Sequence, residues 1–334
     1  MLYPADMEDS KKGLSVSRVE AGQKLLNFLK RRVNAPDGDL HRWIRTGQVR
    51  INGGRTKPFD HVAEGDIVRV PPFAVFRTMD STPDAEHKVK PLYSGLPDIV
   101  YEDADILVMN KPAGLTVQGG TGHEDSVAAR VARAFAHADF TPAPVHRLDK
   151  DTTGLLIFGK SYRSIRFLTD ALAGRGGTPP RKDYLAWVEG LWPYPVQELR
   201  DLLVKDEATQ RMIVCSAGSP GWQKMHAAEA RLLAVPLVSR RIGSDEYTLM
   251  LLQLLTGRTH QIRVQLASRG HPVAGDTLYG SGGCAGLKLH AFHVCLPSLE
   301  EKALNLELPP PWTKDWYIDQ NILSMINCSS QHVR

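Results

Sequence analysis

The sequence predicts an α+β fold, with a mixed, mostly antiparallel sheet in a large domain and a small N-terminal unit of helices and strands before it. Short apolar runs and stretches of alternating apolar and polar residues predict strands, because neighbouring side chains of a strand point to opposite faces. Such stretches occur at 106–109, 155–158, 184–188, 227–235, 247–255 and 289–291. Helices are expected at 21–33, 39–46, 126–137 and 162–172.

Length and composition indicate a folded protein of one large or two moderate domains. The chain has 334 residues, of which 42% are hydrophobic and 23% charged, so global disorder is not expected. The net charge is +4, but residues 17–71 alone hold eleven Lys and Arg against six Asp and Glu. This excess of five leaves one net negative charge for the rest of the chain. A basic excess confined to one small segment is typical of a nucleic-acid contact.

The four cysteines form no CxxC pair, so a zinc finger is not expected. Residues 1–12 lack the apolar core of a signal peptide, and no apolar run is long enough to span a membrane. We therefore expect a cytoplasmic protein with reduced thiols and no membrane partner.

The N-terminal unit is expected to follow a disordered stretch at 1–16. Leucines on one face of the helix at 21–33 predict burial, with Arg31 and Arg32 on the solvent side. The helix at 39–46 places Arg42 and Arg45 on a shared face, because they are three residues apart. Asn52-Gly53 then predicts a tight hairpin, and 67–70 predicts the returning strand.

This segment resembles an S4 domain, a small RNA-binding module. The resemblance rests on the spacing of the buried leucines and isoleucine in the two helices, on 45–53 and on 64–68. It implies that the second helix and the adjacent turns contact RNA, which puts Arg42, Arg45 and Arg50 forward as RNA-binding residues. The alternative is that the basic residues form only a solvated charged face.

The remaining boundaries follow from local composition. Four prolines interrupt 72–97, which predicts a linker between the S4-like domain at 17–71 and the large domain at 98–312. The segment 196–221 is expected to be irregular or to form a hairpin with loops, and 313–334 is expected to be a polar C-terminal tail.

One carboxylate, one tyrosine and one arginine-rich turn are the candidates for chemistry. Asp149 lies in a polar turn before the strand at 155–158, where most aspartates only form turns. Tyr184 lies on a strand, and 256–266 contains Arg258, His260 and Arg263. The set suits a carboxylate nucleophile or base beside a cation, with an aromatic ring to stack on a flat substrate. Spacing alone neither favours nor excludes a Ser-His-Asp or Cys-His site.

Together these segments resemble the RluA/RluC/RluD-type pseudouridine synthases. The arrangement of an S4-like domain before the catalytic domain is most similar to the RluC branch. The matching residues are His146-Arg147-Leu148-Asp149 with Thr152-Thr153-Gly154, Lys182 to Gly190, and Gly257 to Val264. Asn110 to Gly114 and Gly270 to Asp276 fit as well. Two positions depart from the pattern, because Gln118 and Gln265 stand where the family commonly has histidine, and both are expected to tune RNA contacts.

The resemblance implies a redox-neutral isomerisation in a central catalytic cleft, without any cofactor. Asp149 would act on a flipped-out uridine at C6 of the base or C1′ of the sugar, and Arg263 would pair with it. Tyr184 would stack on the base and take up a proton in a later step, and Arg147 would fill the gap left by the flipped nucleotide. Arg258 and His260 are expected to support the turn or touch RNA, and His146 is expected to bind RNA.

The expected partner is large-subunit (23S) ribosomal RNA or a ribosomal precursor, bound by a monomer. Transfer RNA is the alternative substrate. Two other readings stay open at this point: a non-catalytic RNA-binding or ribosome-assembly protein, and a carboxylate-based nucleoside hydrolase.

Overall fold

The computed structural model describes residues 13–76, 95–119, 125–136, 138–175, 180–215, 227–297 and 303–331. The expected disorder at 1–12 and most of the expected linker, 77–94, lie outside these residues. None of the helices that the structure describes is long and apolar enough to cross a membrane.

The N-terminal unit is a four-stranded sheet with two helices, in the strand order β1-β4-β2-β3. Its elements are β1 (Leu14–Ser15), α1 (Leu25–Arg32), α2 (Asp37–Arg45), β2 (Arg50–Ile51), β3 (Gly54–Arg55) and β4 (Ile67–Arg69). The expected disorder at 1–16 is wrong for residues 13–16, because β1 pairs with β4 and Val16 is buried in the core of the unit. Pairing with an existing strand satisfies the backbone of this short segment.

The two helices and the hairpin form largely as expected. Leu25, Phe28 and Leu29 of α1 pack in one core with Leu40, Trp43 and Ile44 of α2. Asn52 and Gly53 both have positive φ angles, 49° and 80°, as a two-residue turn between β2 and β3 requires.

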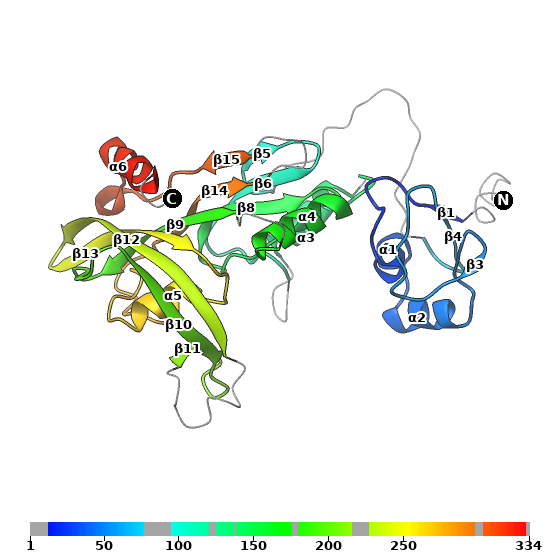
Figure 1. Cartoon of the computed structure of the whole chain (residues 1–334), viewed down its shortest axis with the longest axis horizontal. Helices are drawn as coiled ribbons and strands as arrows, with labels where there is room; N and C mark the ends of the chain where they lie inside the picture. Colours follow the sequence, from blue (N-terminus) through cyan, green and yellow to red (C-terminus); the bar gives the residue numbers. More distant parts are fainter. Residues whose placement is uncertain are drawn as a thin grey trace.

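The large domain is built on one 11-stranded sheet, in the order β11-β10-β12-β13-β9-β14-β8-β6-β5, with β15 beside β14 and β7 beside β8 (Figure 1). Its strands are β5 (Ile99–Glu102), β6 (Ile106–Lys111), β7 (Ala143–Pro144), β8 (Thr153–Gly159), β9 (Arg181–Glu189), β10 (Gln197–Lys205), β11 (Met212–Cys215), β12 (Ala228–Ile242), β13 (Asp245–Leu254), β14 (Leu289–Leu296) and β15 (Leu304–Glu307). Only the pairing of β8 with β14 is parallel among the described strands. The expected α+β fold with a mixed, mostly antiparallel sheet is confirmed.

The helices of the large domain are α3 (Val127–Ala134), α4 (Tyr162–Leu172), α5 (Gln261–Ala267) and α6 (Gln320–Gln331), with a 3-10 helix at Lys314–Trp316. The serines before α3 and α4 cap them, since the side chains of Ser126 and Ser161 accept hydrogen bonds from backbone amides in the first turn. Strand β9 divides the core: Tyr184, Ala186 and Val188 face one cluster, and Leu185 and Trp187 face the other. The alternation expected from the sequence is present.

The segment 196–221 contains the antiparallel hairpin of β10 and β11, which is one of the two alternatives expected for this segment, and the hairpin projects from the body of the domain (Figure 1). One expectation about the large domain is wrong. The described part of 313–334 is not a free polar tail, because Ile318, Ile322 and Ile326 are buried against the sheet with Trp312. These isoleucines recur every four residues and so form one apolar stripe that needs a partner surface.

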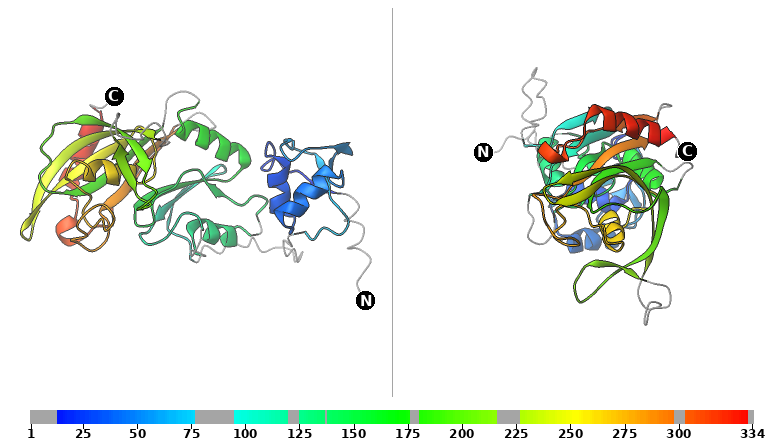
Figure 2. Two further views of the ribbon diagram at one scale, coloured as in Figure 1. Left: turned by 90° about the horizontal axis from the view of Figure 1, so that it is seen from below. Right: turned by 90° about the vertical axis from the view of Figure 1, so that its left-hand side faces the viewer.

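The N-terminal unit contacts the large domain near the start of α4 (Figure 2). The backbone N–H of Tyr162 donates to the carbonyl of Val19 over 3.0 Å, and the guanidinium of Arg31 lies 4.1 Å from the ring centroid of Phe140. Arg32 is paired with the buried carboxylate of Glu20 at 2.7 Å. Arg31 is exposed, as expected, while Arg32, also expected on the solvent side, is half-buried in its pair with Glu20.

Candidate active site

Asp149 lies in the turn that leads into β8, next to the buried Leu148. The N–H of Thr152 donates to the carbonyl of Asp149 over 3.2 Å and closes the turn. Gly154 follows with φ +108°, and a Cβ at this position would collide with the carbonyl oxygen of Ala291 in β14. The close approach of β8 and β14 therefore requires glycine and fixes the turn against the sheet.

Lys111 holds the same turn from the other side. Its fully buried ammonium donates to the carbonyls of Lys150, at 2.7 Å, and of Pro112 and Leu115, both at 2.8 Å. Burial lowers the pKa of Lys111 to about 8, while the charges of Asp151 and Asp149 oppose this shift. The role of Lys111 in holding this turn was not predicted from the sequence, although a lysine at the end of an apolar strand could have indicated it.

Arg263 reaches Asp149 from α5. Its Nη1 donates to Oδ2 of Asp149 over 3.2 Å, so the salt bridge expected between the two residues is present. On its other edge the guanidinium makes a bidentate contact with Asp276, with Nε to Oδ2 at 2.7 Å and Nη2 to Oδ1 at 2.8 Å. Burial by itself would lower the pKa of Arg263, but Asp276 and Asp149 raise it well above its usual range.

Asp276 was quoted in a matching motif but not recognised as part of the site. Its buried carboxylate also accepts hydrogen bonds from the backbone N–H groups of Leu278 and Tyr279. Burial raises the pKa of Asp276, but the hydrogen bonds and charge of Arg263 outweigh this effect and hold it below its usual value. The buried carboxylate is thus a fixed anchor for the arginine.

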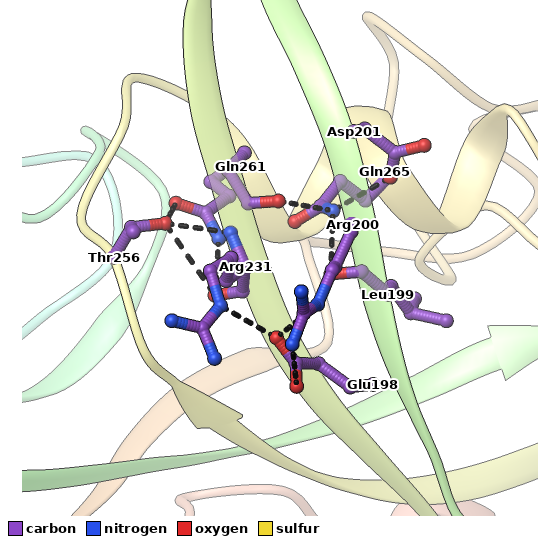
Figure 3. A network of polar contacts seen from close by, with 9 residues as sticks. Glu198, Leu199, Arg200, Asp201, Arg231, Thr256, Gln261 and Gln265 are labelled. Carbon is purple, nitrogen blue, oxygen red and sulfur yellow. Dashed lines mark hydrogen bonds and ion pairs between the residues drawn. The ribbon is translucent and has the colours of Figure 1, made fainter.

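A polar network fixes the helix that carries Arg263 (Figure 3). Oε1 of Gln261 accepts from Oγ1 of Thr256 at 2.8 Å and from the N–H of Arg258 at 3.0 Å, and its Nε2 donates to the carbonyl of Arg231. One turn later, Nε2 of Gln265 donates to Oδ2 of Asp201 in β10 over 2.6 Å. Gln265 is fully buried, whereas Gln118 is exposed.

Tyr184 faces the same site from β9 and is almost entirely buried. Burial, and then the negative charge of Asp149, raise the pKa of its hydroxyl well above its usual value. Tyr184 is therefore a neutral phenol at neutral pH. Its hydroxyl is a poor base until another step removes the proton.

His146 and Arg147 point in different directions from the same turn. Nε2 of His146 accepts the N–H of Ile157 in β8 over 3.2 Å, and burial, followed by the charge of Lys182, lowers its pKa to about 4. This neutral imidazole supports the sheet. Arg147 is exposed beside Asp149.

The other expected residues fall into two groups. Nε2 of His260 lies 3.9 Å from Oδ1 of Asp149, and Arg258 is exposed in the same turn, where its Nε donates to the carbonyl of Glu229. Arg42, Arg45 and Arg50 lie on the N-terminal unit and do not join this cluster (Figure 1). Arg42 is paired with Asp39, while Arg50 donates to the carbonyls of Gly47 and Gly53. Among the described residues, no cluster of ligands that could hold a metal ion is found.

The chain matches known proteins over most of its length. The family model of RNA pseudouridylate synthases matches residues 105–268, which include Asp149, Tyr184 and Arg263. The chain is 33% identical over 302 residues to ribosomal large subunit pseudouridine synthase C of Haemophilus influenzae, covering 86% of this chain and 88% of that protein. It is 35% identical over 277 residues to the protein of the same name from Escherichia coli, covering 81% and 80%.

Solved structures support the same fold. Human RNA pseudouridylate synthase domain containing 1 matches with a TM-score of 0.55 and 22% identity, over 73% of this chain and 97% of that one. The resemblance found in the sequence is confirmed, and the protein belongs to the RNA pseudouridylate synthase family as an isomerase of the RluA/RluC type.

Proposed function

We propose that this pseudouridine synthase isomerises specific uridines of large-subunit ribosomal RNA, and that Asp149 is the residue that acts on the target. The observation that carries the assignment of Asp149 is its contact with Arg263, which comes from a separate helix and is itself fixed by Asp276. A turn-forming aspartate needs no such partner. The ribosomal substrate rests on the names of the two bacterial relatives.

The target uridine must leave the RNA stack before Asp149 can reach it, because the glycosidic bond is shielded in a stacked strand. Extruding a nucleotide costs a few kcal/mol. In this proposal Arg147 fills the gap in the strand and Tyr184 stacks on the extruded base. Two observations support these roles. Arg147 is exposed, and Tyr184 lies close enough to Asp149 for the carboxylate charge to raise the pKa of its hydroxyl.

The reaction breaks the bond between C1′ and N1 and forms a bond between C1′ and C5. The electron pair of the broken bond goes to the base, the base rotates, C5 loses its proton after rejoining, and N1 carries a proton in the product. No atom or electron is gained or lost overall. Asp149 takes part at C1′ or C6, and Arg263 provides the cationic hydrogen-bond partner of its carboxylate.

We further propose that the N-terminal unit, as an S4-like domain, binds RNA with Arg42, Arg45 and Arg50. Its basic excess and its two-helix architecture support this proposal. A ribosomal RNA substrate is in keeping with a cytoplasmic location.

The test is to incubate the purified protein with unmodified large-subunit ribosomal RNA and, separately, with unmodified transfer RNA, and to map pseudouridines by mass spectrometry. We expect modification of the ribosomal RNA by the wild type and none by Asp149→Asn, with RNA binding retained. Modification of transfer RNA alone would show that transfer RNA, and not ribosomal RNA, is the substrate. Full activity of Asp149→Asn would remove the assigned role of Asp149, and released uracil would indicate hydrolysis.

A further inference from the structure

His260 has a backbone conformation that turns its ring towards Asp149. It precedes α5 with φ 52° and ψ 21°, in the left-handed region that residues other than glycine rarely adopt. The hydrogen bonds on either side hold it there, since Val264 N–H donates to the carbonyl of His260 and Gln261 N–H to that of Arg258. A strained residue held at a site by its surroundings is a candidate for function.

Tyr279 fixes one nitrogen of the ring. The backbone N–H of Met212, at the start of β11, donates to the hydroxyl oxygen of Tyr279 over 3.1 Å. The same oxygen lies 2.9 Å from Nδ1 of His260. A phenol has one proton to give. Within the described residues, Nδ1 is the acceptor placed to receive it, so the arrangement that satisfies every group has Tyr279 donating to Nδ1.

This assignment puts the proton of the neutral ring on Nε2. Burial lowers the pKa of His260, against the opposing charge of Asp149, so the ring carries a single proton at neutral pH. The surroundings favour the same tautomer independently. Nε2 lies 3.9 Å from Oδ1 of Asp149, where an N–H is attracted to the carboxylate and a lone pair would be repelled.

The Nε2–H group is left available. A separation of 3.9 Å is too long for a hydrogen bond, and in the part of the chain that the structure describes Nε2 has no other hydrogen-bond partner. Oδ2 of Asp149 is taken by Arg263, so Oδ1 and the Nε2–H group lie side by side. About a quarter of each side chain is exposed, 25% for His260 and 27% for Asp149, which leaves room for a ligand to meet both.

We propose that His260 is a further catalytic residue, whose neutral Nε2–H donates a hydrogen bond to a carbonyl oxygen of the target uracil, and that Tyr279 is the positioning residue that sets its tautomer. This inference rests on the proposed role of Asp149. A nucleotide atom attacked by Oδ1 lies within a few Å of Nε2, so the carbonyl oxygens of its base come within reach.

A hydrogen-bond donor at this position would stabilise the charge that develops on the base during the reaction. When the bond between C1′ and N1 breaks, its electron pair remains on the base and spreads onto the carbonyl oxygens. A fixed donor to one of these oxygens is worth more in the transition state than in the bound uridine. No proton needs to transfer, because a neutral hydrogen bond is sufficient.

Three variants test the donor and its positioning. His260→Ala removes the donor, His260→Gln keeps an amide N–H that can replace it, and Tyr279→Phe leaves Nδ1 without its proton donor. His271→Ala is the matched control, since His271 belongs to the same domain and bonds the carbonyl of Glu189 through Nδ1, away from Asp149. The measurements are the single-turnover rate on the target RNA, the Kd for that RNA, and the melting temperature.

We expect His260→Ala to lower the single-turnover rate about 100-fold, the effect typical of losing one such donor, with Kd nearly unchanged. His260→Gln should recover much of this loss, and Tyr279→Phe should fall between the two. His271→Ala should match the wild type. A wild-type rate in His260→Ala, or a loss confined to Kd, would overturn the proposal.

Nitrogen-15 NMR of the wild-type imidazoles tests the tautomer without relying on activity or on the folding of any variant. We expect His260 to carry its proton on Nε2 at neutral pH. A proton found on Nδ1 in the wild type would refute the inference. If the wild type modifies no RNA at all, the proposed function is refuted instead. The tautomer of His260 is tested by the NMR measurement independently of that outcome.

Discussion

Arg263 and Asp276 form the buried ion pair on which the geometry of the site depends. Two parallel hydrogen bonds, at 2.7 and 2.8 Å, join the guanidinium to the carboxylate, and the side chains are 11% and 0% exposed. The third nitrogen of the guanidinium is then directed at Asp149. A bidentate contact sets orientation as well as distance, so Asp276 determines where the arginine meets the proposed catalytic carboxylate.

Asp276→Asn is expected to lower both stability and activity. The change leaves Arg263 buried without its main counter-ion, and breaking a buried pair in this way typically costs about 3–5 kcal/mol. Denaturant unfolding measures the loss. Asp170→Asn is the control, because Asp170 pairs with Arg175 on the surface and such pairs contribute about 0–1 kcal/mol. Equal effects of the two changes would show that Asp276 is not the anchor of Arg263.

Gly154→Ala is expected to prevent the close approach of β8 and β14. Its Cβ would collide with the backbone of Ala291, in addition to the cost of a positive φ. Gly114→Ala separates the two effects, since Gly114 also has a positive φ, 81°, but has nothing within 4 Å of the new Cβ. We expect a loss of about 1–2 kcal/mol for Gly114→Ala, and a much larger loss or failure to fold for Gly154→Ala. Similar melting temperatures for the two variants would contradict this interpretation.

His290 is expected to make the protein less stable in mild acid. It is fully buried, hydrogen-bonded to Oγ1 of Thr153 and the carbonyl of Leu308, and burial lowers its pKa to about 4. Between pH 6.5 and 4 the unfolded chain therefore binds a proton that the folded protein does not, and the free energy of unfolding falls as pH falls, by up to about 3 kcal/mol. Below pH 4 this contribution stops changing.

Urea unfolding at several pH values checks this effect. His290→Gln retains an amide N–H for the carbonyl of Leu308 and cannot titrate, so its stability should fall less steeply over the same range. An unchanged slope in His290→Gln would place the acid sensitivity elsewhere.

Arg45→Ala is expected to weaken RNA binding and to reduce its dependence on salt. Each basic side chain that neutralises a phosphate of a duplex steepens the slope of log K against log salt by about one, so its removal makes the slope shallower by the same amount. Arg45 is exposed at the end of α2, and Arg241→Ala, at the end of β12, is the single-charge control on the large domain. Filter binding at several salt concentrations provides the slopes. The same slope for wild type and Arg45→Ala would exclude an interaction of Arg45 with phosphate.

Local patterns in the sequence were sufficient for most elements of the fold. Period-two alternation assigned the two faces of β9, Asn52-Gly53 assigned a hairpin, and α4 was expected at the residues where it occurs. These features depend on interactions between residues close in the chain, which a sequence displays directly. The isoleucines of α6 were a readable pattern that was overlooked in a polar context.

The class of fold, the family and the expected proximity of Asp149 and Arg263 could be inferred from the order of the amino acids alone. The groups that hold these two residues are visible only in the folded chain. Lys111 is 39 residues from the carbonyl of Lys150 that it binds, and Met212 is 67 residues from Tyr279. Such contacts are created by the packing of the sheet, and no local spacing encodes them. For the same reason the hydrogen bonds of Gln265 to Asp201 and of His146 to the N–H of Ile157 are visible only in the folded chain, where neighbouring strands supply the partners.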